Sequence, residues 1–336
     1  MMNNRTSRQH QSSNRLEGDI QIRIKAPGGP EVLEVMESFP QEPGPGEIRI
    51  RQHAIGINFI DIYHRAGLYP LTEPHIPGVE GAGVVEAVGA DVEGIQVSDR
   101  VAYAGVPGAY ASTRILPAWR AIRLPDDIPF ETAATSMLRG LTAHMLLTVS
   151  YPVSSGSVLL VHAAAGGLGV MLTRWAKHMG ATVIGTASTK EKAAYAIAKG
   201  ADHVIVGRDA DVIREVSDLT NASGVDFAID GIGGDMLRKS LGSVRPFGAV
   251  ASIGWVSGPV SPIRIEELGT ASLAKPSVMA YSADRERYTQ AAEEVIKVFG
   301  VGIVADVGGE YRLADAAKAH MELELGRTTG SLVLVP

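Results

Sequence analysis

Small residues follow a short apolar run near the middle of the chain, at a spacing that suits binding to the phosphates of a nucleotide. The run is Val158–Val161, and Ala164, Gly166 and Gly169 follow it at the spacing of the dinucleotide fingerprint, with Ala in place of the first Gly. Gly166 lets the backbone approach a pyrophosphate, and Gly169 lets the next helix pack closely on the strand. The free N–H groups and positive dipole end of that helix hold the phosphates. The expected contacts are Ala165, Gly166, Gly167, Leu168 and Gly169.

The residues around this turn complete a strand–helix–strand unit. The expected helix runs through Trp175 and Met179 and stops at Gly180, a common residue at helix C-termini. The β-rich run 181–187 follows directly. A structural glycine turn in another α/β fold is the competing interpretation, but the whole local context favours a dinucleotide site.

The end of the second strand indicates which dinucleotide binds. Enzymes that prefer NAD usually carry Asp or Glu about 20 residues past the fingerprint, to bind the ribose 2′-OH. Here Ser188 and Thr189 are neutral, and Lys190 and Lys192 follow. Hydroxyl and ammonium groups attract a 2′-phosphate that a carboxylate would repel, whereas Glu191 can serve a helix N-terminus. We expect NADPH; the alternative is that the lysines form a solvated helix face.

Composition describes a globular chain of 336 residues, 45% hydrophobic and 20% charged, long enough for two domains. The net charge of −6 makes nucleic acids and anionic membranes poor partners, and no apolar run reaches the roughly 18 residues of a membrane span. The sequence has no cysteine, which excludes disulfides and thiolate-bound zinc and fits a cytoplasmic enzyme. Residues 1–19 are polar and predict a disordered tail.

The pattern of elements changes twice along the chain. From 21 to about 120, short strands separated by Gly and Pro predict a twisted, partly antiparallel β-domain. A helical system at 132–148 then leads into five or six β/α units, which predict a doubly wound parallel sheet. The later strands of that sheet are expected at 183–186, 204–206, 225–229 and 249–253. After it, a helix at 282–300, a strand, a helix at 313–325 and a strand at 332–335 are expected to return to the first domain.

Three stretches of the chain carry a family resemblance. They read NFIDIYHRAGLYP at 58–70, PGVEGAGV at 77–84 and HAAAGGLG at 162–169, with RGLTA at 139–143 as a fourth familiar segment. Together they resemble the NADPH:quinone oxidoreductase branch of the medium-chain dehydrogenase/reductase superfamily, the zeta-crystallin-like proteins, over residues 21–336. The resemblance implies an α/β fold with a Rossmann-type doubly wound parallel sheet plus a β-rich GroES-like catalytic domain. The implied divisions are 20–137 with 276–336 for the catalytic domain and 138–275 for the dinucleotide-binding domain.

The sequence departs from the zinc alcohol dehydrogenases of the same superfamily. Their Cys ligand would fall near Asn58 and their His ligand at Val79, and neither residue here can bind zinc. His53, His64 and His75 are spaced like no recognised metal motif. We therefore expect no metal.

The chemistry expected without a metal is hydride transfer from NADPH to a quinone. Quinones are electron-poor, so the protein must mainly place the nicotinamide against the ring and supply donors for the developing oxyanion. By resemblance and by donor chemistry, Asn58 and Tyr63 are the first candidates, and Tyr69 and Arg65 the second. Asp61 could orient a donor or cap the following helix. For Arg65, a surface ion pair is the competing interpretation.

The resemblance also implies cofactor contacts outside the fingerprint. Thr142 is expected near the nicotinamide, and Arg327 is expected to contact a phosphate. Relatives tend to carry a Tyr beside the adenine ribose where this chain has Gly207, and Arg208 could take its place. Asp230 is expected either to belong to the cofactor site or to be only a turn residue. The full expected set beyond the fingerprint is Thr142, Ser188, Thr189, Lys192, Arg208, Gly254 and Arg327.

Two other functions remain open at this point. The same geometry could reduce an activated C=C bond in an enone or enoyl thioester, with Tyr63 or Tyr69 supplying the proton. A structural or RNA-binding protein that also binds the cofactor is the third possibility, although the acidic charge opposes RNA binding. A homodimer is expected because the run 245–254 could place a strand at a sheet edge, and because the resemblance implies pairing there, as members of the family generally do.

Overall fold

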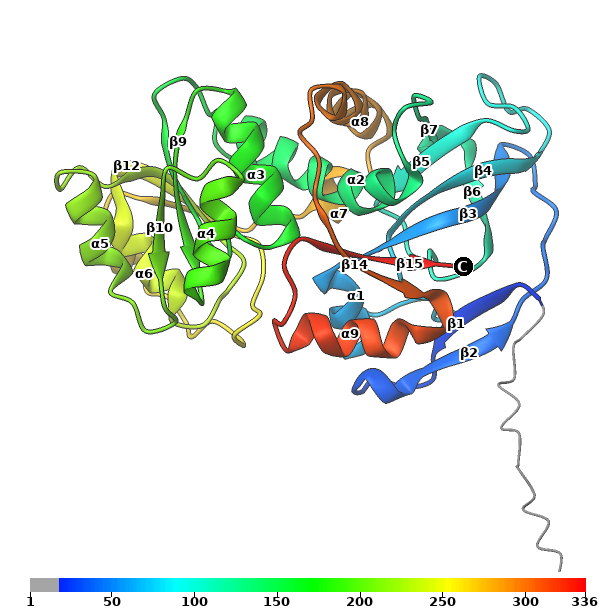
Figure 1. Cartoon of the computed structure of the whole chain (residues 1–336), viewed down its shortest axis with the longest axis horizontal. Helices are drawn as coiled ribbons and strands as arrows, with labels where there is room; N and C mark the ends of the chain where they lie inside the picture. Colours follow the sequence, from blue (N-terminus) through cyan, green and yellow to red (C-terminus); the bar gives the residue numbers. More distant parts are fainter. Residues whose placement is uncertain (1–17) are drawn as a thin grey trace, which may run out of the picture.

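The computed structural model describes residues 18–336 and is built on two large sheets that lie side by side along the long axis of the molecule (Figure 1). The expected tail, residues 1–19, lies outside the described residues except for its last two. Of these, Asp19 is held by a bidentate ion pair with Arg51, at 2.6 and 3.1 Å.

The first sheet has six parallel strands in the order β10-β9-β8-β11-β12-β13. It confirms the expected doubly wound sheet. Its strands are β8 (Val158–Val161), β9 (Thr182–Ala187), β10 (His203–Val206), β11 (Val225–Asp230), β12 (Val244–Ser252) and β13 (Ser272–Ala274).

Helices cover both faces of this sheet because its strands are apolar on both sides. In β8, Leu159 and Val161 pack into the cluster that contains residues of α2 and α3. Leu160, which points to the opposite face, packs with residues of α5 and α6. The helices of this half are α3 (Gly167–His178), α4 (Lys190–Ala198), α5 (Val212–Leu219) and α6 (Met236–Ser243).

The second sheet has seven strands, six of them in the order β14-β15-β3-β4-β5-β7, with β6 paired to β3. Most of its pairs are antiparallel, as expected, and β14 and β15 come from the end of the chain. This confirms the expected return of the last segment. The strands are β3 (Glu47–Ile57), β4 (Glu80–Val88), β5 (Arg100–Ala104), β6 (Thr113–Pro117), β7 (Ile122–Arg123), β14 (Val307–Arg312) and β15 (Ser331–Val335), with a separate ribbon of β1 (Ile20–Ile24) and β2 (Leu33–Glu37).

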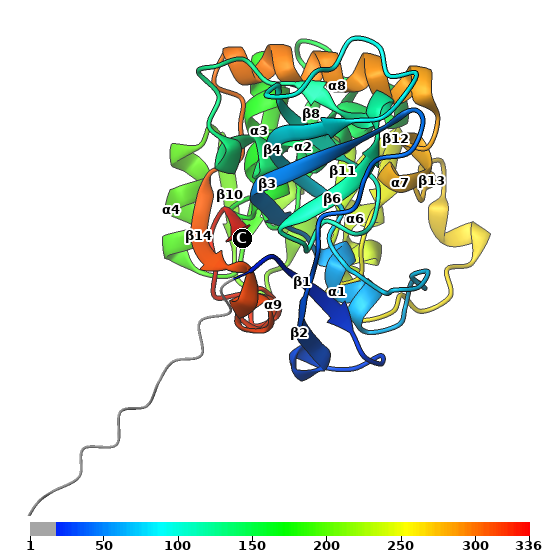
Figure 2. The same ribbon diagram turned by 90° about the vertical axis from the view of Figure 1, so that its right-hand side faces the viewer.

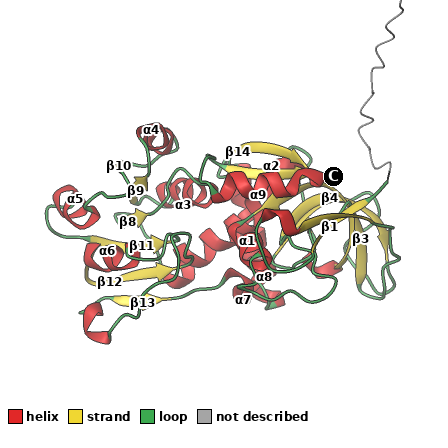
Figure 3. Cartoon of the chain, turned by 90° about the horizontal axis from the view of Figure 1, so that it is seen from below, coloured by secondary structure: helices red, strands yellow, loops and turns green. Residues whose placement is uncertain are grey.

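One hydrophobic core continues from one sheet to the other. It joins Ala54 and Val79 of the antiparallel half to Leu159 of the parallel half through residues of α2 and α8. Seen end-on and from below, these helices lie between and beside the two sheets (Figures 2 and 3). The remaining helices are α1 (Phe59–Arg65), α2 (Phe130–His144), α7 (Val278–Tyr281), α8 (Arg285–Gly300) and α9 (Ala316–Glu324).

The three helical segments expected at 132–148, 282–300 and 313–325 are present, but they differ from the expectation in detail. The helix expected over 132–148 ends as α2 at His144 and continues as a π-helical turn, Met145–Ser150. The helix expected over 282–300 begins at Arg285, after Asp284 has capped it by accepting from the N–H of Arg287. The helix expected over 313–325 starts with a 3-10 turn before α9.

The run 245–254 does not form a sheet edge, contrary to expectation. It belongs to β12, which starts earlier than expected and pairs with β11 on one side and β13 on the other. The edge strands of this sheet are β10 and β13. The argument for a homodimer from an exposed β12 therefore loses its basis, because β13 pairs with Ala249–Ala251 on that side.

Candidate active site

The glycine turn after β8 has the shape of a phosphate cradle. The chain turns at Ala163, which has a φ of 51°, and Gly166 is the N-cap residue of α3 with no side chain to cap the helix. A Cβ atom on Gly166 would meet only the carbonyl oxygen of Ala163, at 3.2 Å, among the described residues. A Cβ atom on Gly169 would lie 2.7 Å from Cα of Ala164, so only glycine allows this approach. The first N–H groups of α3 are thus free to bind an anion.

The same turn is the place where the chain's last segment meets the parallel sheet. A Cβ atom on Gly167 would collide with the side chains of Ser331 and Arg139. The N–H of Gly330 donates to the carbonyl of Ala165 at 3.2 Å. The turn is therefore held from both halves of the molecule.

A second group of expected residues gathers at the end of β9. Thr189 caps α4 by accepting from the N–H of Lys192, and the Lys192 ammonium donates to the carbonyl of Gly326 at 2.7 Å. Partial burial and the nearby charge of Arg208 lower the pKa of Lys192. The structure thus brings together Thr189, Lys192 and Arg208, and places Gly326, the neighbour of Arg327, against Lys192. The Arg327 side chain is exposed and lies 3.7 Å from Glu322.

Three further residues lie at this edge. Ser188 directly follows β9 and is half-buried. Hydrogen bonds to its own backbone N–H and to Thr189 lower the pKa of Glu191, so this carboxylate serves the start of α4. Gly207, at the end of β10, has a φ of 117°, a conformation that a tyrosine side chain would strain.

The ends of β11 and β12 lie next to this edge. Asp230 is fully buried, and its carboxylate accepts from the N–H groups of Ile232 and Gly233 at 2.7 and 3.1 Å. Burial raises the pKa of Asp230 against the effect of these bonds. It therefore organises the turn after β11. A Cβ atom on Gly254 would lie 2.8 Å from the carbonyl oxygen of Gly231, so Gly254 allows the two turns to touch.

An aromatic cluster joins the two halves at this point. The backbone N–H of Trp255, the residue after Gly254, donates to the hydroxyl oxygen of Tyr63 at 3.2 Å. Tyr69 is stacked on Trp255 with ring centroids 6.3 Å apart, and it meets Tyr63 edge-on at 5.9 Å. Because the Tyr63 oxygen accepts the bond, its own hydroxyl hydrogen is still available to a ligand. Burial raises the pKa of Tyr63 and keeps the phenol protonated at neutral pH.

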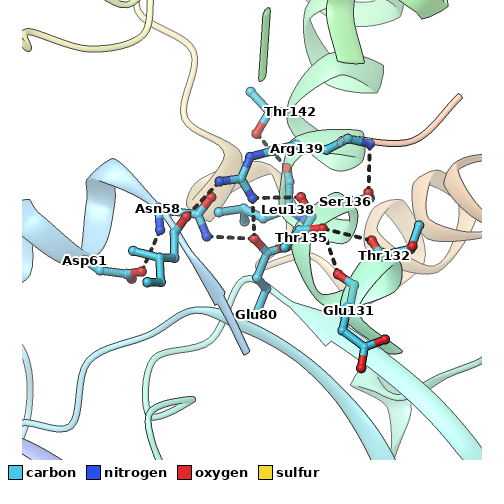
Figure 4. Close-up of polar contacts among 12 residues, drawn as sticks. Asn58, Asp61, Glu80, Glu131, Thr132, Thr135, Ser136, Leu138, Arg139 and Thr142 are labelled. Carbon is cyan, nitrogen blue, oxygen red and sulfur yellow. Dashed lines mark hydrogen bonds and ion pairs between the residues drawn. The ribbon is translucent and has the colours of Figure 1, made fainter. Parts of the chain in front are cut away.

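Asn58 is part of a buried ion-pair network (Figure 4). Its side-chain amide donates to Oε1 of Glu80 at 2.7 Å, and Arg139 donates to the same oxygen at 2.9 Å. The second carboxylate oxygen of Glu80 accepts from the N–H of Leu138 at 2.7 Å. Arg139 also donates to the carbonyl of Ile57 at 2.7 Å. One of the two amide hydrogens of Asn58 is therefore already used, and one is left for a ligand.

Thr142 lies on the same helix, α2, as Arg139 (Figure 4). Its hydroxyl donates to the carbonyl of Leu138 at 2.7 Å, and its side chain is largely buried. The hydroxyl oxygen keeps its acceptor lone pairs.

Asp61 and Arg65 are the two charged candidates of α1. Their side chains are engaged by contacts within the protein, which argues against a direct role at the substrate. Asp61 caps the helix by accepting from the N–H of Asn58 at 2.9 Å, and it also accepts from the Tyr110 hydroxyl at 3.2 Å. Burial raises the pKa of Asp61 to about 7. Arg65 is 2% exposed and pairs with Glu324 at 2.6 Å. It makes the expected ion pair, but a buried one that attaches α1 to α9.

Two searches of residues 18–336 describe what else the chain holds. No helix there combines the length and the apolar character that crossing a bilayer requires. Within the same range, no three His, Asp or Glu side chains are grouped as a metal ion would need.

Comparison with known proteins identifies the family. A family model described as alcohol dehydrogenase GroES-like domain matches residues 44–126, and one described as zinc-binding dehydrogenase matches residues 167–297. The quinone oxidoreductase of Pseudomonas aeruginosa is 43% identical over 94% of this chain and 99% of its own. The chain belongs to the quinone oxidoreductase branch of the medium-chain dehydrogenase/reductase superfamily.

Two further relatives define the range of chemistry in this branch. The crystal structure of Escherichia coli quinone oxidoreductase complexed with NADPH has a TM-score of 0.90 and 38% identity, and covers 94% of this chain and 100% of that one. A 2-haloacrylate reductase from Burkholderia is 39% identical over 93% of this chain and 98% of its own length.

The residues present fit the NADPH of this family. The glycine turn offers N–H groups with no partner within the helix, and the charge of Arg208 is near enough to Lys192 to add to the effect of burial in lowering the Lys192 pKa. An anion between them would remove that repulsion, as a 2′-phosphate would. This electrostatic need agrees with the neutral residues Ser188 and Thr189 at the strand tip.

Sequence reasoning missed the roles of three residues in this site. In the sequence, Glu80 stands out only as the neighbour of Val79, and Arg139 only as part of a familiar helix segment. The available signal was that each is a charged residue within an apolar stretch, and such a stretch must be buried. Trp255 gave no signal, because its contact with Tyr63 joins residues 192 positions apart.

Proposed function

We propose that the protein is a zinc-independent, NADPH-dependent quinone oxidoreductase. The observation that supports this most directly is the position of the Tyr63 hydroxyl, bonded to the loop after β12 at the junction between the glycine turn's sheet and the antiparallel half. Bound NADPH would supply a hydride. The acceptor ring would then lie beside donors from the other half.

Each expected site residue has a role under this proposal. Tyr63 donates its free hydroxyl hydrogen to the acceptor oxygen, and Asn58 offers its remaining amide hydrogen to the same developing charge. Tyr69 and Trp255 provide aromatic surface beside which a flat acceptor would lie. Asp61 positions Asn58 through the helix cap. Thr142 offers hydroxyl lone pairs to the carboxamide of the nicotinamide.

A second group holds the cofactor. Ala165, Gly166, Gly167, Leu168 and Gly169 form the turn at the pyrophosphate, and Gly254 lines the crevice at the end of β12. Ser188, Thr189, Lys192, Arg208 and Arg327 would hold the 2′-phosphate.

Zinc independence is supported by the residues at the two positions where zinc relatives are expected to carry ligands. Asn58 is engaged by Glu80, and Val79 is fully buried in the core. The test is turnover of NADPH with 1,4-benzoquinone by protein dialysed against a chelator. We expect full activity without added metal. Activity that disappears on dialysis and returns with Zn²⁺ would overturn this part, and no turnover over a panel of quinones would overturn the whole proposal.

Reduction of an activated C=C bond is the second candidate function, and the 2-haloacrylate reductase relative favours it. The same donors would serve it, because hydride addition to an enone also creates an oxyanion. Deuterated NADPH, incubated with an enone and in a parallel reaction with a quinone, separates the two functions. Deuterium bound to carbon in the product would support alkene reduction, whereas formation of hydroquinone alone supports the first proposal.

We also propose the division of the chain into 20–137 with 276–336 and 138–275, a cytoplasmic location, and a homodimer. The division is supported by the two sheets, whose strands fall on either side of these boundaries. With β12 covered, the homodimer rests on family resemblance alone. Sedimentation at micromolar concentration tests it, and a monomeric mass would exclude it.

A further inference from the structure

A cavity of about 250 Å³ adjoins the aromatic cluster of the proposed active site. Its walls come from two loops, one after β1 and one after α1, together with residues at the ends of those elements. Tyr69 belongs both to this wall and to the cluster with Tyr63 and Trp255. The lining consists of Ile24, Lys25, Ala26, Pro27, His64, Gly67, Tyr69, Pro70, Leu71 and His75.

The wall is mainly aliphatic. Ile24, Ala26, Pro27, Pro70 and Leu71 present only carbon side chains to the cavity. An apolar cavity of about 150 Å³ is enough to hold benzene. The space beside Tyr69 is therefore large enough for a short alkyl chain.

His64 is a buried polar residue in this mainly aliphatic wall. It is 7% exposed, and its imidazole makes no hydrogen bond with the part of the chain that the structure describes. Burial lowers the pKa of His64 to about 4, so the ring is neutral and offers one N–H donor and one nitrogen acceptor. Nδ1 has no partner and is fully enclosed, so Nε2 is the nitrogen that a ligand hydroxyl in the cavity would bond.

The Lys25 ammonium and the His75 ring, two other polar groups at the cavity, already have partners. The Lys25 ammonium lies 3.1 Å from Glu34, and the His75 ring lies 3.5 Å from Glu73. They give no reason to expect an anion. The wall therefore fits an aliphatic group that carries one neutral hydrogen-bonding oxygen.

We propose that this cavity binds the substituent of a substituted benzoquinone, with the quinone ring at the Tyr63–Tyr69–Trp255 cluster and a short hydroxyalkyl chain reaching His64. The proposal rests on the proposed quinone reduction and names the acceptors that the site prefers.

The test compares three benzoquinones that share one ring and differ in one substituent: methyl, butyl and 3-hydroxypropyl. The butyl and hydroxypropyl chains have nearly the same size, so their difference isolates the hydroxyl. We expect kcat/KM to rise about fivefold or more from methyl to butyl, because three more methylene groups leave water. We expect hydroxypropyl to equal or exceed butyl, because His64 compensates the hydroxyl for the water it loses. Equal values for methyl and butyl would overturn the proposal.

Two variants and a control locate the effect. Leu71→Trp fills the cavity and should remove the advantage of butyl over methyl. His64→Leu keeps the volume without the ring nitrogens, and should lower the hydroxypropyl-to-butyl ratio about tenfold. Leu68→Trp is the matched control, because Leu68 is on the same loop, is 53% exposed and does not line the cavity. The proposal is overturned if His64→Leu leaves the ratio unchanged, or if Leu68→Trp acts like Leu71→Trp.

A binding measurement separates this proposal from the proposed function. Methyl-labelled protein titrated with butyl-1,4-hydroquinone should show NMR shifts at Ile24 and Leu71, with methyl-1,4-hydroquinone as the reference. Shifts at these methyls without any quinone turnover would leave the cavity as a binding site and reject the reaction. Turnover with no such shift would reject the cavity and leave the reaction standing.

Discussion

Tyr63 is the residue on which the proposed chemistry depends most, because its hydroxyl group is the proposed proton donor. Tyr63→Phe keeps the ring and removes the proton donor, so kcat with 1,4-benzoquinone should fall by about 10². The dissociation constant of NADPH should not change. Stopped-flow measurement of NADPH oxidation in H₂O and D₂O checks this, since the solvent isotope effect should also change. An unaltered kcat would show that solvent supplies the proton.

Lys192 tests the choice of cofactor at the same scale. Lys192→Ala removes a cation from the expected 2′-phosphate site and should raise KM for NADPH about tenfold or more, because charge-assisted bonds are among the stronger ones. KM for NADH should change little. Lys190→Ala is the control, because Lys190 is exposed on the first turn of the same helix. Equal effects of Lys192→Ala on both cofactors would contradict this assignment.

Asp61 makes stability depend on pH. Its pKa of about 7 in the folded protein lies above the roughly 3.9 of an unfolded chain, so the folded state binds the extra proton between these values. Its contribution to stability is therefore complete below pH 4 and is lost as pH rises towards 7, at up to about 1.4 kcal/mol per pH unit. Asp61→Asn should flatten this slope in urea denaturation between pH 5 and 7. A slope that persists in the variant would assign it to another group.

At the scale of elements, Glu80 joins three of them: the start of β4, the N-terminus of α1 and the middle of α2. Glu80→Gln leaves the Arg139 charge buried without its partner, and should lower the free energy of unfolding by about 3–5 kcal/mol. Glu86→Gln is the control on the same strand, since its pairs with Arg49 and Arg51 are partly exposed, and should cost less than about 1 kcal/mol. Chemical denaturation measures both. Similar losses of unfolding free energy in the two variants would mean that the Glu80 network stabilises the fold no more than the partly exposed pairs of Glu86.

Elements with a strong local signal could be predicted from the sequence, and those defined by tertiary contacts could not. The strand Val158–Val161 was predicted to the residue, because a short apolar run ends there at a glycine turn. The strand β13 has three residues and no local pattern, so the mistaken sheet edge at β12 followed from missing it. The π-helical end of α2 was also missed, because the apolar spacing of 145–148 suits either helix type.

The same division holds for the candidate site. The fingerprint turn and the tip of β9 follow one another along the chain, so the sequence already predicted their order and chemistry. The contact of Tyr63 with Trp255 and the pairing of Glu80 with Arg139 each join residues of different elements. Sequence alone offered candidates for these positions but not their partners, since burial is what selects among possible pairs.

At the scale of the whole molecule, the proposed cofactor site is held by segments from both halves, so NADPH should stabilise the entire fold. The glycine turn touches Gly330, and Lys192 touches Gly326, although these pairs are far apart in sequence. At a concentration of 100 times Kd, a ligand that binds only the folded state adds about 2.7 kcal/mol, which corresponds to a rise in Tm of roughly 4 °C for a chain of this size. NADH at the same concentration should give a smaller rise, because it lacks the phosphate that Lys192 and Arg208 would bind. Differential scanning fluorimetry without any acceptor measures both shifts, and Lys192→Ala should bring them together. Equal shifts in the unmodified protein would mean that the cations at the tip of β9 do not select the cofactor, even if the reaction itself proceeds.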